Sequence, residues 1–390
     1  MSIDKLPEDV LLDIFDFYVI EPSITEKEVE AWQILVHVCR QWQSVVFGSP
    51  HRLRLRLFCA TTARTPLRDG LDIWPALPLL IQGTVKKAEE LDNTIAVLER
   101  SNHVYNIGLV NQSSYLENIL SAMQKPFPEL KNLGLISNEG ATVIPDSFLG
   151  GSAPHLRTLL LLNIPFPGLP KLLLSATHLV DLFLSNIPHS RYFSPKGIVT
   201  ALSTLTSLGL LHLGFESPRS LPDGESQHPP PLTGSILPAL GTLMFKGVSE
   251  YLEDLVALID TPRLYSLHIT LFNQILFDTP QFIQFISRTP MLIVHKKACL
   301  AFENDAAEVV LSSPNRSIYH KIDVKILCRE SEWQVSSLEQ VCNWCLPPLS
   351  ALEDLYIYEN SKSPPDWRGN AENTSVKRQI SLKCLKLLVK

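Results

Sequence analysis

An apolar motif recurs along most of this chain, and its spacing limits the folds that the chain can adopt. The motif has an apolar residue, two spacers, a second apolar residue, one spacer and a third apolar residue. Successive matches start 26, 26, 23, 26, 35 and 24 residues apart, at Val104, Leu130, Leu156, Leu179, Leu205, Leu240 and Leu264. A period of this length accommodates one strand and one helix, and each such unit can bury its apolar face only against its neighbours. The chain is therefore expected to form a stack of repeated units.

Helix signals lie between these strand motifs. Ser194-Pro195 and Thr279-Pro280 are typical of helix starts, and Ser336 has a glutamate three residues later, as in a capping box. Helical apolar spacing is found at 88–100, 251–259, 282–286 and 338–344. We expect an α/β fold in which parallel strands line the concave face of a curved solenoid and helices cover its convex face. The alternative is an ordinary α/β domain whose strands are rich in leucine.

The repeat pattern weakens at 292–302 and 322–326, and it returns at 352–357 and 382–387. Two segments interrupt it, at about 215–237 and 360–378, because prolines and glycines gather there. The first segment explains the spacing of 35 residues. Both are expected to be long loops, which are either tolerated insertions or functional segments.

The first 57 residues do not share this pattern. Pro7 suits the first turn of a helix, and an apolar stripe follows at helical spacing, made of Val10, Leu11, Ile14, Phe15 and Tyr18. Thr25 with Glu28 opens a second helical segment, whose stripe contains Trp32, Leu35, Cys39, Trp42 and Val46. Two short amphipathic segments cannot bury a core of ordinary size. Some of their apolar surface is therefore expected to contact a partner or the following domain.

The N-terminal residues resemble the F-box family. The resemblance rests on Leu6-Pro7-x-Asp9-Val10-Leu11-x-x-Ile14-Phe15 followed by Val38-Cys39-Arg40-x-Trp42, and it covers residues 3–57. The segment between the two parts, Ile20 to Glu30, departs from the family because it is acidic and rather long. The resemblance implies binding to the Skp-type adaptor of a cullin ubiquitin ligase through Leu6, Pro7, Val10, Leu11, Ile14, Phe15, Val38, Cys39, Arg40 and Trp42. The alternative is a helical pair that only caps the repeats.

The apolar motif resembles the irregular leucine-rich repeats that often accompany F-boxes. The expected organisation is a helical F-box domain at 1–57, a connecting segment at 58–100 and leucine-rich repeats at 101–390. Such proteins are adaptors, so the resemblance implies no catalytic step.

Composition argues against several function classes. The net charge is −6 and charged residues make up only 19% of the chain, which argues against a broad nucleic-acid interface. The first residues lack a basic segment followed by an apolar stretch, and no stretch of about 18 apolar residues occurs, so we expect no secretory signal and no membrane span. Seven scattered cysteines do not resemble a disulfide framework. A reducing location, the cytoplasm or the nucleus, is expected.

The common motifs of catalysis are absent from the sequence. It has no Walker-type glycine loop, no nucleophile elbow, no H-E-x-x-H and no dinucleotide fingerprint. Cys342 and Cys345 have the spacing of a metal or redox pair, but no second ligand pair accompanies them, so we interpret them as core residues. Histidines occur singly, and His268 stands at an outward position of a strand. We expect a protein that is not an enzyme and needs no metal or cofactor.

The repeat frame also predicts which side chains face away from the core. Spacers alternate with apolar residues along each strand, so they point to the other face. At these positions the chain has many apolar and aromatic side chains and one histidine: Leu160, Leu162, Phe183, Met244, His268, Tyr356 and Tyr358. An exposed apolar surface of this kind is typical of a binding site. We expect it to bind a protein substrate; the alternative is that loops or the C-terminal segment cover it.

These expectations combine into one hypothesis, the substrate-recognition subunit of a Skp–cullin–F-box ubiquitin ligase. Its helices would bind the adaptor, its repeats would bind a protein substrate, and it would act as a single copy. A second hypothesis is a repeat scaffold that assembles no ligase. A third is an enzyme with a site in the long loops, which requires a cluster of perturbed ionisable groups in a pocket.

Overall fold

The structure is a computed structural model, and it describes residues 6–18, 31–49, 52–53, 55–63, 67–72, 77–138, 142–188, 193–217, 234–272, 279–293, 295–313, 321–328, 330–342, 346 and 352–359. The chain divides into two compact units, Met1–Leu159 and Leu160–Lys390. Over the described residues, the main sheet has 13 strands in the order β1-β2-β3-β4-β5-β6-β7-β9-β11-β14-β13-β12-β15. The predicted α/β class, with a mostly parallel sheet whose strands alternate with helices, is confirmed.

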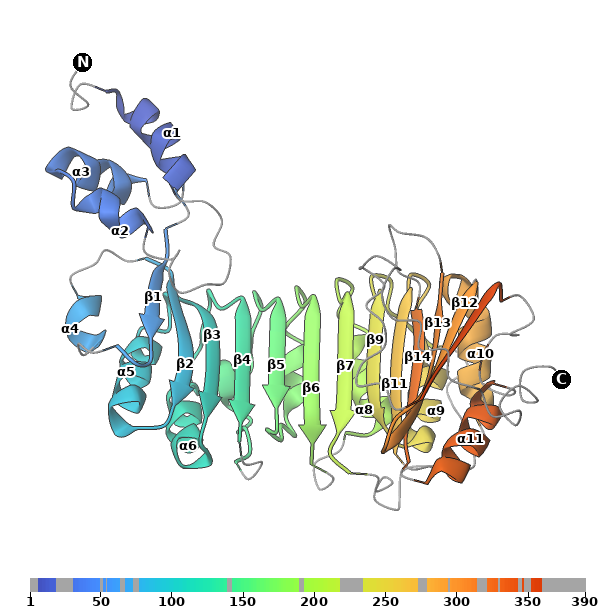
Figure 1. Cartoon of the computed structure of the whole chain (residues 1–390). Helices are drawn as coiled ribbons and strands as arrows, with labels where there is room; N and C mark the ends of the chain where they lie inside the picture. Colours follow the sequence, from blue (N-terminus) through green and yellow to red (C-terminus); the bar gives the residue numbers. More distant parts are fainter. Residues whose placement is uncertain are drawn as a thin grey trace. The chain divides into compact units, whose positions relative to one another are not determined.

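Unit 1 begins with three helices and continues with alternating strands and helices. The helices are α1 (Glu8–Tyr18), α2 (Ala31–Val36), α3 (Arg40–Gly48), α4 (Leu67–Leu71), α5 (Ala88–Glu99) and α6 (Ser113–Ala122). The strands are β1 (Leu57–Ala60), β2 (Leu79–Val85), β3 (Val104–Asn111) and β4 (Asn132–Ser137), and β5 (Thr158–Leu162) continues into unit 2. Strands β1 to β4 pair in parallel. Figure 1 shows α5 and α6 on one face of these strands.

The apolar motif forms the core between the strands and the helices of unit 1. On β3, Ile107 and Leu109 are 1% exposed, and on β4 Leu133 and Leu135 are buried to the same degree. Burial of each such side chain stabilises the fold by about 2 kcal/mol. The residues between them face away from the helices because side chains alternate along a strand. The other face of the sheet is therefore called the helix-free face below.

Unit 2 follows the same plan with longer connections. Its helices are α7 (Leu169–Leu173), α8 (Pro195–Leu202), α9 (Ser249–Leu258), α10 (Pro280–Arg288) and α11 (Ser331–Gln340). Its strands are β6 (Asp181–Ile187), β7 (Leu210–Phe215), β8 (Ser235–Ile236), β9 (Thr242–Gly247), β10 (Ile259–Asp260), β11 (Ser266–Phe272), β12 (Lys297–Phe302), β13 (Ala306–Ser312), β14 (Lys321–Leu327) and β15 (Asp354–Glu359). In Figure 1, α8, α9 and α10 lie behind the strands of this unit.

Two of the three predicted helix starts are confirmed. Ser194 caps α8, because its hydroxyl oxygen accepts a hydrogen bond from the N–H of Gly197 at 3.1 Å. Pro280 is the first residue of α10. The start predicted at Ser336 is wrong, because α11 begins five residues earlier, at Ser331.

The parallel arrangement predicted for all strands is wrong near the end of unit 2. β11 pairs in parallel with β14, not with β12. β13 runs antiparallel to both β14 and β12, and β15 pairs in parallel with β12. Only residues 303–305 separate β12 from β13. Because a parallel crossover needs a dozen residues or more, so short a connection forces the chain to reverse direction.

The motif frame predicted at Leu205 is also wrong. In β7 the buried leucines are Leu211 and Leu213, and these pair with Leu182 and Leu184 of β6. Leu210, which the predicted frame placed in the core, lies on the helix-free face. The leucines before and after position 210 offer two frames of the same spacing, and packing selects the later one.

The second N-terminal segment forms two helices rather than one. The chain is extended at Cys39, with φ −160° and ψ 167°, and this residue directly precedes α3. Residues 58–100, expected to connect two domains, contribute most of β1, all of β2 and all of α5 to unit 1. Most of the predicted loop at 215–237, and the whole of the loop at 360–378 and the strand motif at 382–387, lie outside the described residues.

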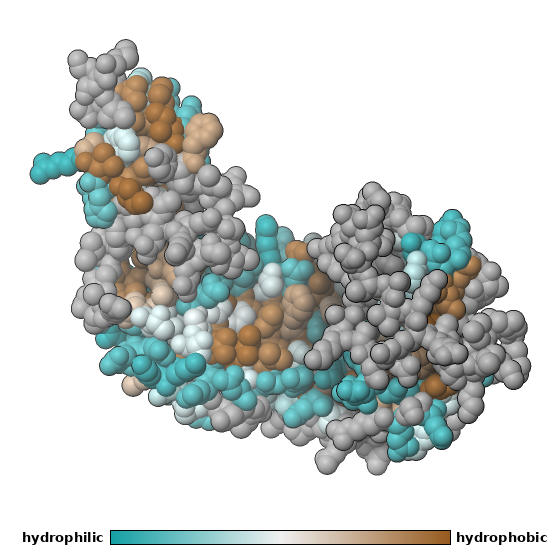
Figure 2. Space-filling view, viewed as in Figure 1, coloured by the Kyte–Doolittle hydropathy of each residue, from teal (hydrophilic) through white to brown (hydrophobic). Residues whose placement is uncertain are grey.

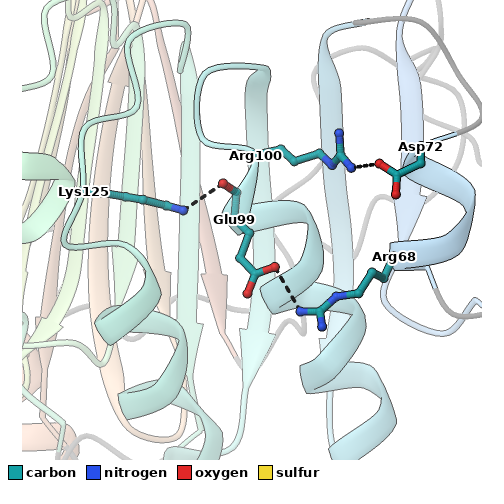
Figure 3. Close-up of polar contacts among 5 residues, drawn as sticks. All are labelled: Arg68, Asp72, Glu99, Arg100 and Lys125. Carbon is teal, nitrogen blue, oxygen red and sulfur yellow. Dashed lines mark hydrogen bonds and ion pairs between the residues drawn. The ribbon is translucent and has the colours of Figure 1, made fainter.

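Polar contacts join α4 to α5 in unit 1 (Figure 3). Arg68 of α4 forms an ion pair with Glu99 at the end of α5, at 3.0 Å, and Arg100 forms one with Asp72. Lys125 donates a hydrogen bond to the backbone oxygen of Glu99 at 2.9 Å, where the helix dipole favours a cation. These contacts are exposed, so they orient the helices more than they stabilise them.

Candidate functional site

Three apolar side chains on α1 are exposed. Val10 is 39% exposed, Ile14 36% and Phe17 80%. Their spacing of four and three residues places them on one side of the helix. Figure 2 shows hydrophobic surface on this helix and on the neighbouring α2 and α3. A phenylalanine that is exposed to this extent contributes little to the stability of the fold, so its surface is available to a partner.

The opposite side of α1 forms the interior of the helical region. Leu11 and Phe15 are fully buried. The Phe15 ring packs edge-on against the Trp42 ring, with centroids 4.9 Å apart. Trp32 of α2 donates from Nε1 to the backbone oxygen of Arg56 at 3.0 Å. Leu11, Phe15 and Trp42 therefore hold the helices together, and only part of the residue set predicted to meet an adaptor is accessible.

The remaining predicted adaptor residues lie at the ends of helices. Pro7 is exposed and precedes α1, Leu6 is half-buried, Arg40 is exposed at the start of α3, and Cys39 is half-buried. Val38 is 53% exposed. Sequence reasoning missed Phe17 and Ile34, which is 67% exposed. The sequence feature that could have identified them is that each is a large apolar residue outside the helical stripe that forms the core.

The residues predicted to bind a substrate lie on the helix-free face of unit 2. Leu160 and Leu162 alternate with buried leucines on β5. The register of the strands brings Phe183, His212, Met244, His268, Asp323, Val310, Cys299 and Tyr356 into one row, from β6 to β15. Tyr358 lies two residues further along β15. The alternation that the sequence predicted is therefore present, and the seven residues predicted to bind a substrate are all half-buried.

The row separates these residues into two groups. Phe183, Met244 and His268 lie within three strand spacings, or about 14 Å. Tyr356 is four strands beyond His268, about 19 Å away, so it belongs to a different part of the face. Sequence reasoning missed His212, whose ring centroid lies 6.2 Å from that of Phe183. The misplaced frame in β7 concealed it.

A polar block occupies the middle of this row. On β11, the hydroxyl of Ser266 lies 2.9 Å from His268 Nε2. Across the strand pair, His268 Nδ1 lies 3.1 Å from Asp323 Oδ2, and Lys321 donates to the same oxygen at 2.7 Å. The register places Ser266 opposite Lys321 and His268 opposite Asp323. Four side chains of two strands thus form one hydrogen-bonded unit.

The surroundings of this block shift two carboxyl groups in opposite directions. Burial disfavours the charge on Asp323, but hydrogen bonds from His268 and Lys321 outweigh burial and lower its pKa to about 2. Burial and the neighbouring Asp323 raise the pKa of Glu308 to about 7. Glu308 is therefore a group of this face that changes its charge near neutral pH.

The Ser266, His268 and Asp323 arrangement resembles a hydrolytic triad in its hydrogen bonds, but the backbone N–H groups at Ser266 are engaged elsewhere. Acyl transfer needs backbone donors aimed at the developing oxyanion. The N–H groups of Tyr265 and Ser266 both donate to the backbone oxygen of Gly241, at 3.0 and 3.1 Å. They are therefore not available to an oxyanion. We interpret the block as one that orients the imidazole on a binding surface.

The described part of the chain lacks the features of two other classes of site. Within it, no group of three or more His, Cys, Asp and Glu residues is placed to hold a metal ion. No described helix is long and apolar enough to cross a membrane. Cys342 is buried at the end of α11, and Cys345 lies outside the described residues.

No protein-family model matches the chain, and no curated protein matches it in sequence. The two surfaces described above are therefore the features that bear on function.

Proposed function

We propose that this protein is an F-box protein with leucine-rich repeats and acts as the substrate-recognition subunit of a Skp–cullin–F-box ubiquitin ligase. In this proposal α1, α2 and α3 form the F-box that binds the Skp-type adaptor. The strands and helices from residue 101 onward form a curved solenoid, and its helix-free face binds a protein substrate. The protein catalyses no step and brings its substrate close to the ligase, in the cytoplasm or the nucleus.

One observation carries the proposal: α1 exposes Val10, Ile14 and Phe17 while its other side is fully buried. A helix with one set of apolar side chains buried and another exposed can pack against its own domain with the first set and bind a partner protein with the second. The residues that carry the F-box resemblance lie on the same helix. The repeating strand and helix pattern supports the second part of the proposal.

The second candidate function is a repeat scaffold that binds the adaptor without assembling a ligase. The features of unit 2 fit it equally well, since a binding face serves either role. The presence of the cullin in the complex separates the two.

The test is co-purification of the full chain with a Skp-type adaptor and a cullin. The wild type is compared with the triple variant Val10→Asp/Ile14→Asp/Phe17→Asp, which changes exposed residues only and should fold. A matched control places three aspartates at other exposed apolar positions, as Leu174→Asp/Ile236→Asp/Ile293→Asp. Phe15 is unsuitable for this test because it is buried.

The proposal predicts that the wild type and the control bind the adaptor in equal amounts with the cullin, and that the α1 variant does not. Adaptor without cullin would support the scaffold. A folded wild type that does not bind the adaptor would overturn the proposal.

A further inference from the structure

Three cations of unit 1 stand at the starts of strands, and no described carboxylate forms an ion pair with them. Arg56 directly precedes β1, Lys131 directly precedes β4 and Arg157 directly precedes β5. Within the described residues none of the three forms an ion pair. Three other arginines of unit 1 do form ion pairs: Arg52 with Asp13, Arg68 with Glu99 and Arg100 with Asp72.

Two of these cations lie against the same aromatic ring. Arg56 Cζ lies 4.7 Å from the centroid of the Tyr105 ring, and Lys131 Nζ lies 4.8 Å from the same centroid. The register between β2 and β3 shifts at this point, because Leu79 pairs with Val104 and Leu80 with Asn106. Tyr105 is thus the extra residue of a β-bulge, a feature that redirects a side chain. We call Arg56, Tyr105 and Lys131 the basic rim.

The helix-free face beyond the rim changes character along the strands β3 and β4. Asn106 pairs with Asn132, Gly108 with Gly134, and Val110 with Ile136. All three pairs point away from the buried leucines of these strands. From the basic rim onward, the face therefore presents amide groups, then bare backbone, then apolar side chains.

The two glycines are not required by the fold. A Cβ at Gly108 would lie 3.6 Å from Gln82 Cγ, and one at Gly134 would lie 3.8 Å from the Ile107 oxygen, which are ordinary contacts. At Gly83, in contrast, φ is +146° and a Cβ would meet Thr61 Oγ1 at 2.2 Å. Glycine weakens a strand, and it is found where another backbone approaches closely.

We propose that the face of β3 and β4 binds an extended segment of the protein substrate that has a carboxylate side chain at one end and an apolar side chain at the other. The carboxylate lies at the basic rim, the backbone crosses Gly108 and Gly134 near the two asparagine amides, and the apolar side chain meets Val110 and Ile136. Five residues separate Lys131 from Ile136, or about 16 Å along the strand. The bound segment is accordingly about five residues long.

This inference rests on the proposed function, because it names the substrate class of the face assigned to substrate binding. Charge complementarity supports an acidic segment, since no carboxylate of the described residues forms an ion pair with the cations of the rim. Attraction between the half-buried basic rim and an acidic segment weakens with salt, though less than attraction between fully exposed charges.

The test is selection of a displayed library of random 12-residue peptides on the purified full chain. We expect selected peptides to have Asp or Glu four to five positions from an apolar residue. Their binding should weaken tenfold or more in Arg56→Glu/Lys131→Glu, and selection on that variant should favour basic peptides. The control Lys171→Glu/Lys196→Glu makes the same charge change at exposed lysines of unit 2 and should leave binding unchanged.

A second variant tests the bare backbone independently of charge. Gly108→Phe/Gly134→Phe fills the face and should abolish binding of the same peptides in a folded protein. Failure to select any peptide, selection of peptides without acidic residues, or binding to either variant that equals binding to the wild type would overturn the inference. Adaptor binding is measured on the same preparations, so intact adaptor binding with failed selection overturns this inference alone.

Discussion

The N-terminal helices and the sheet use apolar residues in opposite ways. In the sheet, the motif residues Leu133, Leu182 and Leu243 are no more than 1% exposed. In the helices, Phe17 and Ile34 are mostly exposed, although both are large and apolar. Burial in the core explains why the motif residues of the sheet are apolar. Burial does not explain why Phe17 and Ile34 of the helices are apolar, because both are exposed. The excess in the helices is what indicates docking.

The comparison also separates two kinds of surface. The helical surface is apolar, whereas the helix-free face of the sheet combines apolar side chains with hydrogen-bonded polar ones. An apolar surface suits a constant partner. A mixed surface suits selection among partners, because a partner that fits poorly leaves polar groups buried without a hydrogen bond, which costs binding free energy. This difference is what the division into an adaptor site and a substrate site predicts.

The largest effect is expected within the helices. Phe15→Ala removes a fully buried ring that packs against Trp42, so it should destabilise the helical region by about 4 kcal/mol. Phe17→Ala on the same helix should cost under about 0.5 kcal/mol. Hydrogen exchange of the α1 amides measures both. Equal exchange in the two variants would show that the two sides of α1 do not differ.

A matched pair on β9 tests the sheet in the same way. Leu243→Ala leaves a cavity in the core and should lower the free energy of unfolding by about 3 kcal/mol. Met244→Ala, one residue later on the helix-free face, should lower it by less than about 1 kcal/mol and weaken substrate binding instead. Urea denaturation distinguishes them, and a reversed order would contradict the assigned faces.

Glu308 should make unit 2 less stable as the pH rises. Its pKa is about 7 in the folded protein and near 4.5 when unperturbed, so the folded state binds its proton more tightly. The stabilisation is complete below about pH 4.5 and is lost as the pH rises through about 7, a decline of about 2 kcal/mol after allowance for solvent screening.

Glu308→Gln carries an amide that does not titrate, so this decline should disappear in the variant. Asp323 acts at the other end of the scale, because its lowered pKa makes its contribution fall only as the pH drops toward 2. Urea midpoints at about pH 5 and pH 8 measure the effect. A wild type and variant with the same pH dependence would contradict the assignment to Glu308.

The smallest effect is expected for the contacts in Figure 3. Arg68→Ala and Arg100→Ala each remove an exposed ion pair between α4 and α5. Each should change the free energy of unfolding by under about 0.5 kcal/mol. A loss above 1 kcal/mol in thermal unfolding would show that polar contacts, rather than the buried leucines, hold this part of unit 1 together.

The sequence predicted what depends on local periodicity. The strands around Leu133, Leu182 and Leu243 were predicted because burial on one face imposes a period of two. The order of β12, β13 and β14 was not, since pairing depends on residues far apart in the chain. At β7 the leucines at 208, 210, 211 and 213 permitted two frames, and only packing distinguishes them.

The candidate sites were predicted in part for the same reason. His268 was recognised as outward-facing, but its partners Ser266 and Asp323 required the pairing of β11 with β14. Phe17 was missed because its position does not belong to the stripe that forms the core. Val10 and Ile14 belong to that stripe and are nevertheless exposed, so periodicity alone does not separate core residues from surface residues on α1.

Hydrogen exchange of the full chain with and without the Skp-type adaptor tests the central claim most directly. The account predicts that the adaptor slows exchange of the amides of α1 and of residues 34–38, and leaves β3, β6 and β9 unchanged. Adaptor binding that protects the strands and leaves α1 unchanged would contradict it.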